Sequence, residues 1–207
     1  VEETERSPEQ ISEDNEKESL FLVSDFAKNY FKRNLFEEEG KTIALSYLKE
    51  RKFKKNIIEK FEIGYSINIK DDFSKAAIKA GYNLNFLEKT GLTIVKDSEN
   101  IDRFRGRVIF PIKSMSGRIL GFGGRILGSS KNLAKYINSP ESLIYQKSKV
   151  LYGIYESKQS IVKNDNCFLV EGYTDVIKMH QCGISNVVAS SGTALSENQI
   201  RLINRLT

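Results

Sequence analysis

Apolar residues recur at helical spacing through the first ninety residues of the chain. Ser7-Pro8-Glu9-Gln10 has the serine, proline and glutamine typical of a helix start, and a long helix is predicted from there to about Leu35. Gly40 interrupts the pattern. Shorter helices are predicted at residues 42–51, 56–61, 71–80 and 84–89. None of them carries a distinctive chemical motif, so we interpret this segment as packing, with a side that faces nucleic acid as the alternative.

The apolar spacing then changes from helical to alternating. The even-numbered positions hold the apolar residues Phe104, Val108, Phe110 and Ile112. The odd-numbered positions before Ile109 hold the arginines Arg103, Arg105 and Arg107. Because side chains alternate between the two faces of a strand, the pattern predicts a strand with an apolar face and an arginine face. A turn at residues 114–117 leads into a return strand at 118–122. We expect a small antiparallel sheet within residues 93–126.

From Ser160 onward the pattern alternates between strand and helix. Strands are predicted around Ile161 and residues 167–170, a helix at about 174–181, a strand at 186–190 and a helix from Ser196. This order with short links is typical of a parallel α/β layer. The predicted fold class is therefore α+β: a helical N-terminal segment and a small antiparallel sheet, followed by an incomplete α/β layer.

Charge is distributed unevenly along the chain. Residues 1–20 contain eight acidic and two basic residues, whereas residues 103–147 contain nine basic residues and one acidic residue. A basic block of this density favours a polyanionic partner, most simply nucleic acid or nucleotide. A solvated surface without a ligand is the alternative.

The scarcity of cysteine and histidine excludes several kinds of site. Two cysteines without a CxxC motif favour a reducing compartment and argue against zinc in this sequence. The single histidine, His180, argues against a histidine-based metal site or a serine triad. Without a signal peptide or a transmembrane run, we expect a cytoplasmic protein. The chain starts at Val1 and ends within a predicted helix, so we expect a piece of a longer protein.

Glu171 and Asp175 are the candidate catalytic residues. The apolar residues 168–170 stop at Glu171-Gly172, and active sites of open α/β sheets lie at the carboxyl ends of strands. Gly172 permits a sharp turn or a close approach to a ligand. Asp175 is also explained as an acid in the first turn of a helix. Two carboxylates alone hold Mg²⁺ weakly, so a metal site here would be incomplete.

The basic block contains candidate phosphate contacts. Gly121-Phe122-Gly123-Gly124-Arg125 is not a dinucleotide-binding motif, because Ile126 stands where a glycine is needed. A glycine-rich strand end or bulge explains it equally well, although Arg125 can reach a phosphate. In the predicted loop that follows, Lys135, Asn138 and Lys147 can contact triphosphate oxygens.

Six blocks in this order resemble the bacterial replicative DNA primase of the DnaG type. They are DRFRGRVIFPI, GRILGFGGRIL, KYINSPES, LYGIYES, FLVEGYTDVI and ASSGTALS, within a resemblance that covers roughly residues 20–207. The resemblance implies the N-terminal part of the primase RNA polymerase core. Residues 1–146 would form its N-terminal α/β subdomain, with 1–20 as an acidic lead-in, and residues 147–207 would form part of a TOPRIM domain.

The resemblance also implies roles for individual residues. Glu171 would be an active-site carboxylate that holds Mg²⁺ or Mn²⁺, with Asp175 beside it. The family completes this site with a later Asp-x-Asp pair, which does not follow Glu171 in this sequence. Zinc would belong to a domain outside it. The implied nucleotide and template contacts are Arg103, Arg105, Arg125, Lys135, Asn138 and Lys147.

The function implied by the resemblance is synthesis of short RNA primers on single-stranded DNA by metal-assisted nucleotidyl transfer. The partners would be the template, nucleoside triphosphates, the RNA primer and, through a region outside this sequence, the replicative helicase at forks in the nucleoid. The fragment itself would be inactive. Two alternatives stay open: a module that only binds single-stranded nucleic acid, and another TOPRIM enzyme such as a topoisomerase or nuclease.

Overall fold

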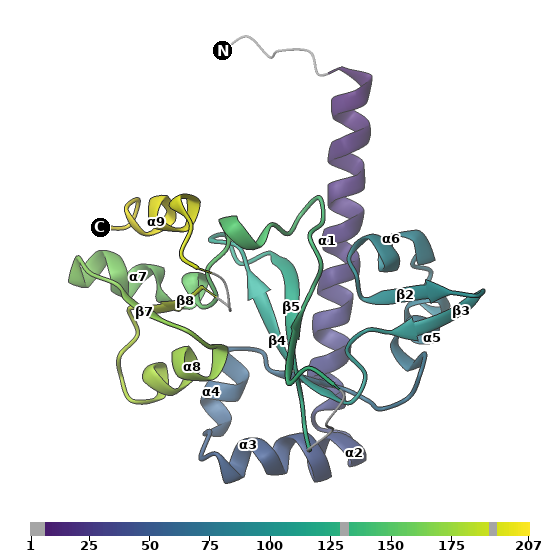
Figure 1. Cartoon of the computed structure of the whole chain (residues 1–207), viewed down its shortest axis with the longest axis horizontal. Helices are drawn as coiled ribbons and strands as arrows, with labels where there is room; N and C mark the ends of the chain where they lie inside the picture. Colours follow the sequence, from purple (N-terminus) through teal and green to yellow (C-terminus); the bar gives the residue numbers. More distant parts are fainter. Residues whose placement is uncertain (1–6, 129–132, 191–193) are drawn as a thin grey trace.

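The computed structural model describes residues 7–128, 133–190 and 194–207. Its longest element is α1 (Pro8–Asn34), which extends beyond the body at its N-terminal end (Figure 1). The Ser7 hydroxyl accepts from the Gln10 amide at 3.3 Å, and the Ser7 amide donates to the Gln10 side chain at 2.9 Å. The predicted helix start is therefore confirmed. Within the described residues, no helix is long and apolar enough to cross a membrane.

Shorter helices follow α1 close to their predicted positions. They are α4 (Lys55–Lys60), α5 (Asp72–Lys79) and α6 (Leu84–Lys89). The prediction at Gly40 is wrong, because α2 (Glu38–Gly40), the π-helical segment η1 (Lys41–Leu45) and α3 (Ser46–Glu50) run without a break. Gly40 allows close packing instead: a Cβ there would lie 1.9 Å from the Asn34 carbonyl oxygen.

A four-stranded antiparallel sheet forms the centre of the N-terminal part. Its order is β1 (Gly64–Ser66), β4 (Arg107–Lys113), β5 (Ile119–Ile126) and β6 (Tyr136–Asn138). The sequence patterns missed β1 and placed β6 in a loop. Strands β2 (Thr93–Lys96) and β3 (Glu99–Asp102) form a separate hairpin.

The predicted arginine face of β4 is wrong. Residues 103–106 form a turn, in which Gly106 has φ of +68° and the Arg103 Nε donates to the Gly91 carbonyl at 2.6 Å. Every residue of β4 itself is buried, including Arg107, whose guanidinium donates to backbone carbonyls of Gly124 and Ala134. Alternation fails as a guide because both faces of this strand are covered.

The C-terminal part is the predicted parallel α/β layer. After η2 (Lys147–Lys149) come α7 (Ile154–Asn164), β7 (Phe168–Val170), α8 (Tyr173–Gln181), β8 (Val187–Ala189) and α9 (Glu197–Ile203), and β7 pairs with β8 in parallel. Ile161 lies in α7, so a strand there is wrong. Although β7 is apolar, Phe168 is 51% and Leu169 44% exposed, since β8 is its one partner in the described part.

The two parts share one hydrophobic core. Phe110 on β4 stacks on Tyr173 at the start of α8, with ring centroids 5.4 Å apart, and Tyr152 contacts the same ring at 4.5 Å. Val176, Ile177 and β8 residues belong to the same buried cluster as β4. This packing brings the turn between β7 and α8 against the four-stranded sheet. The subdomain boundary at 146–147 stays a prediction.

Candidate functional site

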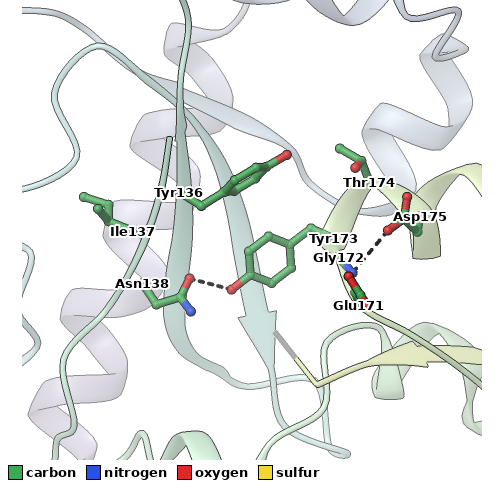
Figure 2. A pocket seen from close by; sticks show the side chains of 8 residues that line it. All are labelled: Tyr136, Ile137, Asn138, Glu171, Gly172, Tyr173, Thr174 and Asp175. Atoms are coloured by element: carbon green, nitrogen blue, oxygen red, sulfur yellow. Dashed lines mark hydrogen bonds between the residues drawn. The ribbon is translucent and has the colours of Figure 1, made fainter. Parts of the chain in front are cut away.

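A pocket of about 470 Å³ lies between β6 and the turn from β7 into α8 (Figure 2). Its lining residues are Tyr136, Ile137, Asn138, Glu171, Gly172, Tyr173, Thr174 and Asp175. Three of the residues singled out from the sequence, Asn138, Glu171 and Asp175, therefore meet at one cavity. Asn138 ends β6, Glu171 lies in the bend directly after β7, and Asp175 lies in the first turn of α8.

Glu171 and Asp175 flank Gly172 at the carboxyl end of β7. Asp175 accepts the Gly172 amide through Oδ2 at 3.2 Å, which is the helix-start role considered for it. Glu171 is exposed and makes no hydrogen bond or ion pair with the residues that the structure describes. Its carboxylate is thus available to a ligand.

Tyr173 ties this turn to β6. Its hydroxyl donates to the Asn138 Oδ1 at 2.7 Å (Figure 2), and its ring lies directly over Gly123 of β5. A Cβ on Gly123 would lie 2.4 Å from Tyr173 Cε2. The glycine run is therefore the interior of a strand that an aromatic ring approaches closely, rather than a strand end or bulge. Nothing in the sequence pattern indicated Tyr173.

A second pocket of about 330 Å³ adjoins the first through Tyr136 and contains Arg125 and Lys135. Arg125 is only 9% exposed as a residue, and its guanidinium lies over Tyr47 at 4.4 Å and Tyr136 at 5.7 Å. Its Nε and Nη1 are buried without a hydrogen-bond partner in the described structure. Because an unpartnered buried charge is unfavourable, this site is suited to an anion. Tyr47, which holds the guanidinium, gave no signal in the sequence.

The other predicted basic contacts are dispersed. Arg103 is half-buried, and burial lowers the pKa of its guanidinium, whereas Arg105 is exposed. Lys147 donates its backbone amide to Glu141 at 3.1 Å and lies at the start of η2. None of the three lines either pocket. A shared surface with Arg125 stays a prediction.

The oxygen donors at Glu171 and Asp175 suit a hard divalent cation. Across residues 7–128, 133–190 and 194–207, however, no three His, Cys, Asp or Glu side chains gather in one group that could hold a metal. The pocket therefore supplies part of a coordination shell.

His180 lies near the end of α8 and connects this helix to α7 and α4. The imidazole lies 3.0 Å from the Ser157 hydroxyl through Nε2 and 3.1 Å from the Lys60 ammonium through Nδ1, and it packs edge-on against Phe61. The lysine can only donate, so Nδ1 accepts and the neutral ring carries its proton on Nε2. Burial, and then the Lys60 charge, lower the pKa of His180 to about 4.

This shift predicts a loss of stability in mild acid. The folded pKa of about 4 is below the unfolded value of about 6.5, so the unfolded chain binds more protons between these values. The contribution of His180 to the free energy of unfolding should fall as pH drops from about 6.5 to about 4, by about 2 kcal/mol after solvent screening. Burial raises the pKa of Asp102 to about 6 and gives an opposite contribution over part of this range, so the pKa of His180 itself is the quantity to measure. His180 is the sole histidine, so its imidazole NMR signals report the pKa directly. A midpoint near 6.5 would contradict the buried neutral ring.

Comparison with known proteins places these features in a family. Residues 30–158 match the family described as DNA primase catalytic core, N-terminal domain, and residues 166–207 match the Toprim domain. DNA primase of Halalkalibacterium halodurans is 41% identical over 204 residues, covering 97% of this chain and 34% of that protein. DNA primase of Escherichia coli K12 is 36% identical over 201 residues, with the same coverage of 97% and 34%. The chain thus spans about a third of the length of these curated relatives.

Solved structures agree with the sequence matches. The RNA polymerase domain of Mycobacterium tuberculosis primase DnaG superposes with a TM-score of 0.85 at 35% identity, over 90% of this chain and 60% of that one. A DnaG primase catalytic domain bound to single-stranded DNA superposes with a TM-score of 0.86 at 34% identity, over 93% and 62%. These matches confirm the predicted fold class and the resemblance. The chain belongs to the DNA primase catalytic core family, with a Toprim match over residues 166–207.

Proposed function

We propose that the chain is part of the catalytic core of an enzyme that synthesises short RNA primers on single-stranded DNA. The observation that carries the proposal is the free Glu171 carboxylate, which lies at the carboxyl end of a parallel strand and lines the pocket beside β6. Membership of the primase family supports the same reaction. Because the described residues supply an incomplete set of metal ligands, we expect activity from the longer protein rather than from this fragment.

The reaction joins a primer 3′-oxygen to the α-phosphorus of a ribonucleoside triphosphate and releases pyrophosphate. Glu171 would hold Mg²⁺ or Mn²⁺, with Asp175 as a supporting carboxylate, and such an ion stabilises the attacking and leaving oxygens. Water and substrate phosphate oxygens normally complete the coordination of these cations. Tyr173 fixes the position of the turn that carries Glu171 relative to Asn138 on β6.

Basic residues would bind the substrates. Arg125 and Lys135, which line the second pocket, would neutralise phosphate there. We propose Arg103, Arg105 and Lys147 as further template or nucleotide contacts on the resemblance alone. The helicase contact and a zinc site would lie outside this sequence, and the protein would act in the cytoplasm at replication forks in the nucleoid.

The incomplete ligand set favours one competing function, a module that binds single-stranded nucleic acid without chemistry of its own. A topoisomerase or Toprim nuclease is disfavoured by the primase match upstream of the Toprim segment. The discriminating experiment incubates the full-length protein with single-stranded DNA, ribonucleoside triphosphates and Mg²⁺. RNA products that require the template support the enzyme, and DNA binding without RNA products supports the module.

Arg125→Gln should separate binding from stability. Loss of the guanidinium removes the phosphate contact, so affinity for single-stranded DNA or nucleoside triphosphate should fall at least about 10-fold. The free energy of unfolding should stay the same or rise, because Nε and Nη1 of the guanidinium are buried without a hydrogen-bond partner among the described residues. Fluorescence anisotropy and urea unfolding measure the two effects.

Arg118→Gln is the matched control, because Arg118 directly precedes β5 but is exposed and donates to Glu18 at 2.7 Å. It should leave affinity nearly unchanged. Equal affinities of the wild-type and Arg125→Gln proteins would refute the anion site.

A further inference from the structure

A dense basic segment lies at the turn between α3 and α4, away from both pockets. Residues 49–60 contain six basic and two acidic residues. Five of the basic residues gather at the turn itself with exposed side chains, and we call them the lysine turn: Lys49, Arg51, Lys52, Lys54 and Lys55. Phe53, the aromatic residue among them, is buried, so the exposed surface of the turn is cationic rather than aromatic.

Lys52 occupies a backbone position that favours glycine. Its φ is +62°, and it ends α3 through bonds from the Lys52 amide to the Lys49 carbonyl at 2.7 Å and from the Phe53 amide to the Leu48 carbonyl at 3.0 Å. This is the arrangement in which glycine usually stands. A lysine there is strained, and strain of this kind at an exposed position points to a use for the side chain.

Glu62 provides an internal comparison. It has the same left-handed backbone, with φ of +50°, after α4. Its carboxylate is used, since it pairs with Lys113 at 2.8 Å and with Lys28 at 3.5 Å. The Lys52 ammonium makes no ion pair or hydrogen bond with any residue in the described part of the chain. Its charge is therefore free for a partner outside the chain.

Helix α8 holds the lysine turn in place. The Gln181 side chain accepts from the Lys54 amide at 2.8 Å and donates to the Lys52 carbonyl at 2.8 Å. The Lys178 ammonium donates to the Arg51 carbonyl at 2.7 Å. The turn lies beside α8 at the lower edge of Figure 1. The backbone that carries the lysines is thus fixed to the helix that begins directly after Glu171-Gly172.

The lysine turn is also continuous with the Arg125 pocket. Arg51 lies over the Tyr47 ring at 5.7 Å, and the same ring lies against Arg125 at 4.4 Å and lines the pocket. The cationic surface therefore extends from Lys135 and Arg125 in the pocket, through Arg51 on the Tyr47 ring, to the exposed lysines of the turn.

We propose that the lysine turn binds the sugar–phosphate backbone of single-stranded DNA and extends the template path beyond the Arg125 pocket. The proposal rests on the proposed function, because it takes the pocket as the neighbouring phosphate site. Lysines are flexible point charges that neutralise phosphates without reading bases, so this contact is independent of sequence and sensitive to salt.

Lys52→Gly in the full-length protein tests the proposal, because it removes the charge and relieves the backbone. Its melting temperature should equal or exceed that of the wild type. Its affinity for an oligothymidylate of about 16 nucleotides should fall about 3- to 10-fold, and the slope of log K against log salt should shrink by about 0.7. A thymidine dinucleotide, whose backbone is too short to contact the pocket and Lys52 together, should bind as before.

Two controls isolate the charge. Lys52→Arg keeps it and should bind as the wild type does. Lys96→Gln removes an exposed charge from β2, beyond α1 in Figure 1, and should have little effect. Unchanged affinity and salt slope in Lys52→Gly, or an equal loss in Lys96→Gln, would overturn the proposal.

Arg125→Gln distinguishes failure of this inference from failure of the proposed function. It should weaken binding of both oligonucleotides. If it does so while Lys52→Gly does not, the pocket stands and the lysine turn fails. If Lys52→Gly weakens binding of the longer DNA and Arg125→Gln weakens neither, the lysine turn stands as a binding surface and the pocket fails.

Discussion

Glu171→Gln in the full-length protein should reduce primer synthesis by at least about 100-fold, the usual scale for losing a group that stabilises charge in the transition state. The side chain is exposed and makes no hydrogen bond or ion pair within the described residues, so the free energy of unfolding should change by less than about 0.5 kcal/mol. Incorporation of labelled ribonucleotides on a single-stranded template measures the first quantity, and urea unfolding measures the second.

Two further variants sharpen this prediction. Glu197→Gln removes an exposed acid from α9 in the same layer and should leave activity unchanged. Asp175→Ala should cost about 1 kcal/mol of stability, because it removes the side-chain oxygen that accepts the Gly172 amide, with a smaller loss of activity. If Glu171→Gln synthesises primers as the wild type does, Glu171 is not the catalytic carboxylate.

Gly123→Ala should destabilise the protein by about 1–3 kcal/mol, the range for overpacking a well-filled core. The added Cβ would lie 2.4 Å from Tyr173 Cε2, so the ring must move away from β5. That movement breaks the hydrogen bond to Asn138 and shifts the turn that carries Glu171. Primer synthesis should therefore fall together with the melting temperature.

A double-mutant cycle shows whether the clash with Tyr173 is the cause. Tyr173→Leu makes room for the new methyl group, so the double variant should be less destabilised than the sum of the two single variants. Gly81→Ala is the control for glycine replacement as such. Its Cβ would meet nothing within 4 Å, and its cost of about 1 kcal/mol should come from the positive φ alone. Strictly additive effects of Gly123→Ala and Tyr173→Leu would contradict the contact.

Features set by neighbouring residues could be predicted from the sequence. The start of α1 depends on Ser7 and Gln10, three positions apart, and the structure has that cap. The position of Glu171 after β7 follows from a short apolar run and a helix start, both of which are local. The primase resemblance rested on six motifs in a fixed order along the chain. The comparisons confirm that resemblance.

Features set by packing could not be predicted in the same way. Arg107 belongs to the alternating pattern of β4, but the pattern does not reveal that a second layer covers the other face and buries the guanidinium. Strand β6 has three residues and exists because it pairs with β5. The contact between Gly123 and Tyr173 joins two layers, and the glycine run looked like a strand end without its partner.

Cleavage by bound iron tests most directly the central claim that the pocket between β6 and α8 is the catalytic centre. Fe²⁺ replaces Mg²⁺ in the full-length protein, and added ascorbate and peroxide generate radicals that cut the backbone near the ion. The pocket predicts cuts around residues 136–138 and 171–175 that excess Mg²⁺ suppresses and that Glu171→Gln abolishes. Cuts elsewhere, or the same cuts in Glu171→Gln, would contradict it.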